Sequence, residues 1–180
     1  MGKVFGIGLS KTGTTSLHHA LGTLGFKGKH YPQRPELFAC DFRYFDDYDA
    51  VTDIPVAPYY PQLDEAYPGS KFILTVRGVD DWLRSMENWW SRSRRPNDFM
   101  MRMRLAVYGV GSFHRARLKY VFEKHERDVR EYFKDRPGDL LILDICAGEG
   151  WDKLCRFLNR PVPPGEFPFV IPGGKSEGRP

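Results

Sequence analysis

The sequence predicts an α/β protein: a three-layer, doubly wound fold around a central, mainly parallel sheet of about four to five strands. Short apolar runs alternate with longer amphipathic segments along the chain, which is typical of parallel strands covered by helices. Each run also stops at a turn-forming or charged residue, as a buried strand does at the edge of its sheet. The expected strands lie at residues 3–8, 50–55, 71–77 and 140–145.

The elements follow one another in a regular order. The strand at 3–8 leads through a glycine-containing loop to a helix, and Pro55 stops the second strand, because proline cannot continue a central strand. The run at 71–77 is rich in β-branched residues and the run at 140–145 is the most continuous apolar segment, so we expect both to be buried. Helices are expected over residues 14–24, 36–42, 59–66, 79–93, 98–107, 113–134 and 151–158.

The chain is expected to form one domain. Its 180 residues, 41% of them hydrophobic and 14% aromatic, are enough for a substantial core and argue against disorder. No internal repeat interrupts the alternation of strands and helices, so a single domain is expected over residues 1–170. From Pro163 onward the chain is rich in proline and glycine and is expected to loop over the surface, with a flexible tail at 171–180.

Charge and cysteine content narrow the class of ligand. The net charge of +4 suits a small polyanionic ligand, and no RRM, zinc-finger or helix-turn-helix pattern is present, so no nucleic-acid partner is expected. The three cysteines, Cys40, Cys146 and Cys155, have no metal-ligand spacing and form an odd set. They are typical of reduced residues in an intracellular protein, and no metal site is expected.

The expected location is the cytoplasm. No stretch approaches the roughly 20 apolar residues that cross a bilayer. The first strand begins by Lys3, which leaves no room for a signal peptide, and Gly6 stands where a myristoylation site needs Ser or Thr. We therefore expect a soluble enzyme with no membrane partner, and the sequence carries no signal for its oligomeric state.

The most informative segment runs from Gly8 to Ser16 and reads GLSKTGTTS. It joins the first strand to the first helix, so its backbone N–H groups and the positive end of the helix point at one anion. Gly8 and Gly13 let the chain approach that anion closely, and the hydroxyl side chains add donors. The residues expected to bind the anion are Ser10, Lys11, Thr12, Gly13, Thr14, Thr15 and Ser16.

The lysine of this loop stands in an unusual place. An ATP- or GTP-binding loop carries lysine directly after its second glycine, where it reaches the β and γ phosphates. That position is Thr14 here, and the lysine is Lys11, two residues before Gly13. The KTGTTS spacing resembles the 5′-phosphosulfate loop of the sulfotransferases, which use 3′-phosphoadenosine 5′-phosphosulfate (PAPS) as sulfuryl donor. A generic anion-binding loop and a degenerate nucleotide kinase remain as alternatives.

A second phosphate-binding element is expected where the strand at 71–77 ends. Arg77 lies at the carboxyl edge of the sheet, where open α/β sheets bind ligands, and Ser85 follows eight residues later on the next helix. In sulfotransferases an arginine and a serine with this spacing hold the 3′-phosphate of the donor, so the resemblance implies that role for both. The sequence departs from the family at Gly78 and Val79, where an acidic or amide residue and a proline are usual. The alternative is a surface ion pair for Arg77 and no ligand for Ser85.

Asp53 is the expected general base. It stands two residues before Pro55, where cytosolic sulfotransferases carry a catalytic histidine. Because other branches of the superfamily use a carboxylate, the resemblance implies that Asp53 accepts the proton of the acceptor. A carboxylate with a pKa of about 4 is a weak base, but burial raises that pKa. The alternative is that Asp53 caps the helix at 59–66.

The resemblance also implies the reaction. A hydroxyl or amine acceptor displaces the sulfuryl group of PAPS in line and leaves 3′-phosphoadenosine 5′-phosphate (PAP), with no covalent enzyme intermediate and no required metal. Lys11 is placed to neutralise the charge that grows on the oxygen bridging to the 5′-phosphate, so Lys11 and Asp53 are the expected catalytic residues. In cytosolic sulfotransferases a glycine-containing loop near the C-terminus closes on the 3′-phosphate, and residues 173–176 would correspond to it. The acceptor is expected to be a small molecule, whose identity the sequence does not encode.

Two other functions remain open. A P-loop kinase or NTPase is disfavoured by Thr14 in the lysine position and by the lack of an apparent acidic strand end near the loop to hold Mg²⁺. A non-catalytic nucleotide-binding protein is opposed by the presence of both Lys11 and Asp53. Trp82, Met86 and Trp89 recur at helical spacing, which favours core packing over an acceptor pocket. His30 and Tyr31 follow the first helix, near the expected ligand-binding edge of the sheet, and are minor candidates for contacts with the acceptor.

Overall fold

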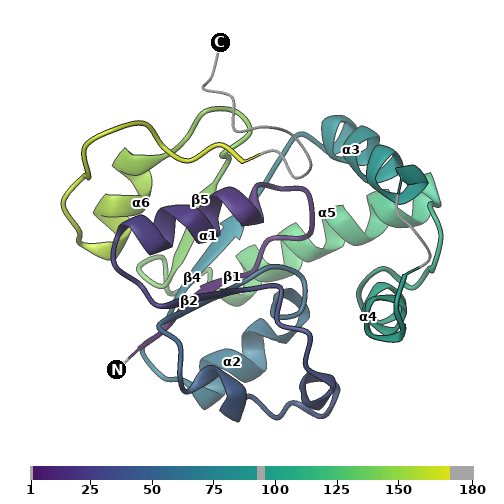
Figure 1. Ribbon diagram of the computed structural model, residues 1–180, viewed down its shortest axis with the longest axis horizontal. Coiled ribbons are helices and arrows are strands. Elements are labelled where there is room, and N and C mark those ends of the chain that lie inside the picture. Colours follow the sequence, from purple (N-terminus) through teal and green to yellow (C-terminus); the bar gives the residue numbers. More distant parts are fainter. Residues whose placement is uncertain (1, 93–95, 171–180) are drawn as a thin grey trace.

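Within residues 2–92 and 96–170, which the computed structural model describes, a five-stranded, all-parallel sheet forms the centre of the protein (Figure 1). The strand order is β2-β3-β1-β4-β5. The strands are β1 (Val4–Gly6), β2 (Gly28–His30), β3 (Ala50–Thr52), β4 (Lys71–Thr75) and β5 (Leu140–Leu143). The predicted α/β class and parallel sheet are confirmed.

Helices cover both faces of the sheet and complete the three layers (Figure 1). The α-helices are α1 (Thr14–Thr23), α2 (Tyr60–Ala66), α3 (Val79–Arg92), α4 (Asp98–Tyr108), α5 (Arg115–Tyr132) and α6 (Trp151–Leu158), and the 3-10 helices are η1 (Pro35–Ala39), η2 (Arg43–Phe45) and η3 (Ala57–Tyr59). Because side chains alternate along a strand, Val4 packs in the cluster with α1 and α6, and Phe5 packs in the cluster with α2 and α5.

A third apolar cluster joins α3, α4 and the first half of α5 beside the sheet (Figure 1). Trp82 lies at its centre, fully buried, with its ring centroid 4.5 Å from that of Phe122. Met86 is also fully buried, so the core role predicted for these two α3 residues is confirmed. Trp89 is only partly buried and is described with the site below.

The ends of α4 follow from local sequence. The Asn97 side chain accepts a hydrogen bond from the Met100 backbone N–H at 2.8 Å, which caps the helix. Gly109 adopts φ 71° and ends it, because this left-handed conformation favours glycine. Both signals are local, and the observed bounds of α4 therefore lie within one residue of the predicted ones.

The strand β2 was not expected. The strands expected from the sequence do not include it, because a three-residue strand that contains Gly28 and Lys29 has no alternating apolar pattern. The pairing with β3, which sets His30 opposite Thr52, supplies the strand instead. Strand formation here depends on a tertiary contact, which outweighs local propensity.

The strand β5 is less buried than its composition indicates. It lies at the edge of the sheet and pairs with β4 alone, so of its four residues only Leu143 is buried. The expectation of a fully buried strand at 140–145 was wrong, since apolar composition does not report the order of strands in the sheet. The helix expected at 36–42 is likewise only the 3-10 helix η1.

The described end of the C-terminal segment contacts the first helix. Residues 163–170 run back to α1, where the Val170 N–H donates to the Ser16 hydroxyl oxygen at 2.9 Å. The predicted tail at 171–180, with the segment 173–176, lies outside the described residues. None of the helices in residues 2–92 and 96–170 combines the length and the apolar character that a transmembrane helix needs.

Candidate functional site

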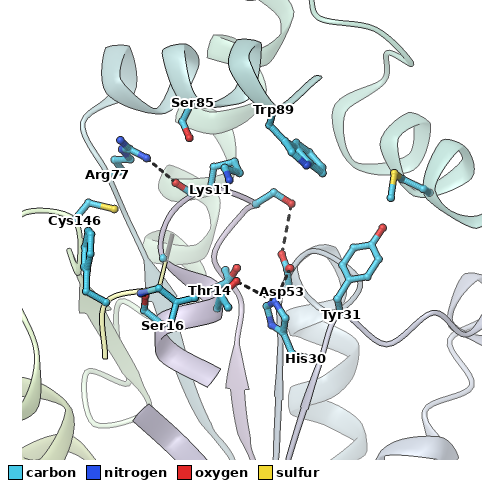
Figure 2. Close-up of a pocket in the computed structure, with 16 residues that line it drawn as sticks. Lys11, Thr14, Ser16, His30, Tyr31, Asp53, Arg77, Ser85, Trp89 and Cys146 are labelled. Atoms are coloured by element: carbon cyan, nitrogen blue, oxygen red, sulfur yellow. Dashed lines mark hydrogen bonds and ion pairs between the residues drawn. The ribbon is translucent and has the colours of Figure 1, made fainter. Parts of the chain in front are cut away.

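A cavity of about 520 Å³ opens at the carboxyl ends of the central strands (Figure 2). The chain passes from β1 to one side of the sheet and later to β4 on the other side, and such a reversal is where open α/β sheets bind ligands. The predicted site residues that line this cavity are Ser10, Lys11, Gly13, Thr14, Thr15, Ser16, Asp53, Arg77 and Ser85. The segments that follow β1, β3 and β4 therefore meet α3 at one site.

The loop after β1 is held in place through its own carbonyl groups. Trp82 of α3 donates from Nε1 to the Ser10 carbonyl at 2.8 Å, and Arg77 donates from Nη1 to the Lys11 carbonyl at 3.2 Å. Gly13, with φ 100°, precedes α1 and no side chain caps that helix. The first N–H groups of α1 therefore remain available to an anion in the cavity.

Thr12 does not take the place that the sequence indicated. Its side chain is fully buried and does not line the cavity. The Thr12 hydroxyl donates to the Leu9 carbonyl at 2.7 Å and lies 2.6 Å from the Thr75 hydroxyl. The Thr12 hydroxyl points into the protein and not into the cavity, so Thr12 connects the loop to β4.

Backbone strain is concentrated at the cavity. Five non-glycine residues of the described chain have positive φ, and three of them line the cavity: Lys11 at 71°, Tyr31 at 47° and Asp53 at 88°. The other two, Cys40 and Asn159, end helices. Positive φ costs a non-glycine residue of order 1–3 kcal/mol and is retained mainly at functional sites.

Gly8→Ala tests how closely the loop approaches β4. A Cβ on Gly8 would lie 1.9 Å from the Thr75 hydroxyl and 2.8 Å from the Thr75 carbonyl oxygen. We expect the free energy of unfolding to fall by about 1–3 kcal/mol, measured by chemical denaturation. Gly22→Ala in α1 is the control: a Cβ there has no neighbour within 4 Å, so stability should rise by about 0.5–1 kcal/mol. A Gly8→Ala protein as stable as the wild type would contradict the close approach.

Asp53 lies directly after β3, and its side chain is almost fully buried. Its carboxylate accepts a hydrogen bond from the Ile54 N–H at 2.8 Å and a longer one from the Ser10 hydroxyl at 3.5 Å. Burial raises the pKa of Asp53, and the charge of His30 together with these hydrogen bonds opposes the rise. Asp53 does not cap α2, which begins after Tyr59 without a side-chain cap.

His30 is the functional candidate that the sequence underrated. Its Nε2 lies 3.3 Å from the Asp53 carboxylate and 3.2 Å from the Thr15 hydroxyl, and its Nδ1 lies 2.9 Å from the Thr52 hydroxyl. The His18 ring stacks on it with centroids 5.3 Å apart. Burial lowers the pKa of His30 against the opposing charge of Asp53. No signal in the sequence indicated this pair, because β2 brings His30 to Asp53 only through strand pairing.

The cavity has two sides (Figure 2). Arg77, Ser85 and Cys146 lie on one side of Lys11, and Asp53 and Tyr31 lie on the other. Burial lowers the pKa of Lys11, the charge of Arg77 lowers it further, and Asp53 and Cys146 oppose the shift. A lowered pKa makes the ammonium group a stronger acid and so a stronger hydrogen-bond donor to an anion in the cavity.

Two features of the cavity wall differ from expectation. Trp89 lines the cavity while it packs against the third apolar cluster, so its expected place in the core is only partly confirmed. Phe169 and Val170 also line it, although the sequence indicated only a surface loop from Pro163 onward. Both arise from contacts between segments far apart in the chain.

An acidic strand end does lie near the loop. Asp53 follows β3, the direct neighbour of β1, so the expectation that no such carboxylate is present was wrong. In the part of the chain that the structure describes, no group of three or more His, Cys, Asp or Glu side chains gathers as a metal site would require. The carboxylate of Asp53 is engaged by His30.

Comparison with known proteins agrees with these features. Residues 3–174 match a family model described as a sulfotransferase domain. A relative from Aspergillus versicolor, "Ava biosynthesis cluster protein M", is 30% identical over an alignment with a length of 214 residues. The alignment covers 93% of this chain and 80% of that protein.

Proposed function

Because the chain belongs to the sulfotransferase domain family, we propose that it transfers a sulfuryl group from PAPS to a hydroxyl or amine of a small-molecule acceptor. The observation that carries the proposal is the shared cavity of the Lys11 loop and the Arg77–Ser85 pair. The relative is named for a biosynthesis cluster, which is in keeping with a small-molecule acceptor.

The two cationic ends of the site match a donor with an anion at each end. The N-terminus of α1, Lys11 and the hydroxyls of Thr14 and Thr15 would hold the 5′-phosphosulfate. Arg77 and Ser85 would hold the 3′-phosphate. Arg77 uses only Nη1 for the Lys11 carbonyl, and a guanidinium has five N–H donors, so the side chain retains donors for a phosphate.

The remaining residues supply the proton chemistry. The acceptor oxygen or nitrogen bonds to sulfur as the sulfur–oxygen bond to the 5′-phosphate breaks, and Asp53 takes the proton that the acceptor loses. Lys11 stabilises the charge on the departing oxygen. His30 holds the Asp53 carboxylate in place through its Nε2 contact and is a positioning residue.

A P-loop kinase is the second candidate, and one observation favours it. Asp53 occupies the strand end from which such enzymes hold Mg²⁺. The loop itself favours the sulfotransferase, because Thr14 replaces the lysine that would reach the β and γ phosphates.

Binding of PAP and of adenosine 5′-phosphate tests the proposal. The two ligands differ by the 3′-phosphate, so PAP should bind about 10- to 100-fold more tightly, as one or two charge-assisted hydrogen bonds provide. Arg77→Ala should remove this difference, measured by isothermal titration calorimetry. Arg84→Ala, an exposed arginine of α3 paired with Asp81, is the matched control and should keep it. Tighter binding of ATP or GTP than of PAP would support the kinase and contradict the proposal.

A further inference from the structure

Arg104 of α4 is a buried cation that forms no ion pair with the described part of the chain. Its side chain is 4% exposed, and neither Nε nor Nη2 has a hydrogen-bond partner among residues 2–92 and 96–170. The guanidinium carbon lies 5.2 Å from the ring centroid of Trp89 and 4.7 Å from that of Trp90. These cation–π contacts stabilise the charge but do not satisfy the N–H groups. The donor edge formed by Nε and Nη2 therefore remains unused.

The same edge binds carboxylates elsewhere in this chain. Arg43 donates from Nε and Nη2 to the two carboxylate oxygens of Asp41, at 2.9 and 2.5 Å. Arg130 donates from the same two nitrogens to a single carboxylate oxygen, Oε1 of Glu126, at 3.0 and 2.6 Å. The parallel N–H groups match the two oxygens of a carboxylate, and an unpaired buried donor is costly. Arg104 therefore carries a pair of unused donors whose geometry suits a carboxylate.

A second unpartnered donor belongs to a residue that lines the cavity, which Arg104 itself does not. Tyr31 lines the cavity, and its hydroxyl is buried with no hydrogen-bond partner in the described part of the chain. Burial and the charge of Asp53 raise the pKa of Tyr31 to about 12, and the nearby charge of Arg104 opposes this shift. Figure 2 shows the Tyr31 ring rising beside Asp53 toward the level of Trp89. Met100 completes this apolar wall.

We propose that Arg104 and Tyr31 form a subsite for a carboxylate on the sulfuryl acceptor. The acceptor is then a hydroxy or amino acid: its carboxylate pairs with Nε and Nη2 of Arg104 and accepts from the Tyr31 hydroxyl, and its nucleophile faces Asp53. The surface of Trp89 and Met100 contacts the body that joins the two groups. Arg104 lies behind the cavity wall, so binding includes a side-chain movement of Tyr31 or Trp89 that opens the donor edge. This inference rests on the proposed sulfotransferase function.

Matched pairs of acid and methyl ester test the subsite. The probes are 3-(4-hydroxyphenyl)propanoate, 4-hydroxybenzoate and 6-hydroxyhexanoate, each titrated with its ester by calorimetry in the presence and absence of PAP. We expect at least one acid to bind about tenfold or more tightly than its ester, as an added charge-assisted pair provides. Arg104→Gln should abolish that preference, and Tyr31→Phe should reduce it severalfold. Arg102→Gln is the control, because Arg102 is an exposed arginine of α4 that stacks on Phe38.

Each outcome decides the inference. Equal binding of acid and ester across all three pairs overturns it, as does an acid preference that persists in Arg104→Gln. If Arg104→Gln does not fold, the wild-type preference and its response to Tyr31→Phe decide. Binding of PAP without an acid preference contradicts this subsite and leaves the proposed function standing. An acid preference without PAP binding supports the subsite and contradicts the proposed function.

Discussion

Lys11→Ala should lower kcat by about a hundredfold or more, because one preorganised donor to a developing oxyanion typically contributes about 3 kcal/mol. The decrease should be seen in the turnover of radiolabelled PAPS, whereas the dissociation constant of PAP should change little. Under the proposed function, the N–H groups of α1 and Arg77 would also hold PAP, so the ground state would keep most of its contacts. Alanine has a Cβ like lysine, so the substitution should not relieve the backbone strain of the positive φ at this position.

The control for this variant is Lys119→Ala, which removes an exposed lysine of α5 with the same change in net charge. It should leave both turnover and PAP binding near the wild-type values. If Lys11→Ala weakened PAP binding by the same factor as it lowered kcat, Lys11 would serve to bind the donor and the catalytic assignment would be wrong.

Asp53→Asn should lower kcat by about 10²- to 10⁴-fold, the usual contribution of a general base. Asparagine keeps the size of the side chain but cannot take the proton of the acceptor. Because burial raises the pKa of Asp53, the acid limb of the wild-type pH profile of kcat/KM should lie above the ordinary pKa of an aspartate. Activity is lost as the pH falls through that raised pKa, since the protonated carboxyl is no longer a base.

His30→Gln distinguishes the role of His30 from that of Asp53. His30 lowers the pKa of Asp53 by its charge, so the loss of His30 should move the acid limb of the pH profile to higher pH. At pH values above this limb, the variant should retain most of the wild-type kcat. His19→Gln, which removes an exposed histidine of α1, should leave the profile in place. A loss in His30→Gln as large as in Asp53→Asn at every pH would make His30 the base.

Local sequence was sufficient for the parts of the site that lie on one loop or one strand end. The position of Lys11 and the strand–loop–helix around it could be predicted because glycine, hydroxyl and apolar spacing act within a few residues. Arg77 could be placed at the cavity for a similar reason, since a charge that ends an apolar run must leave the core. The bounds of α4, which Asn97 and Gly109 set, could also be predicted from local sequence.

Tertiary structure decided the features that depend on which segments meet. The His30–Asp53 pair exists because β2 joins β3, and β2 has no strand pattern of its own. Thr12 turns inward because its hydroxyl contacts the hydroxyl of Thr75 on the neighbouring strand. Among residues 2–92 and 96–170, no anion pairs with Arg104, because α4 packs its side chain against two indole rings. Burial and partner choice arise only when distant segments come together, so composition and spacing alone do not contain them.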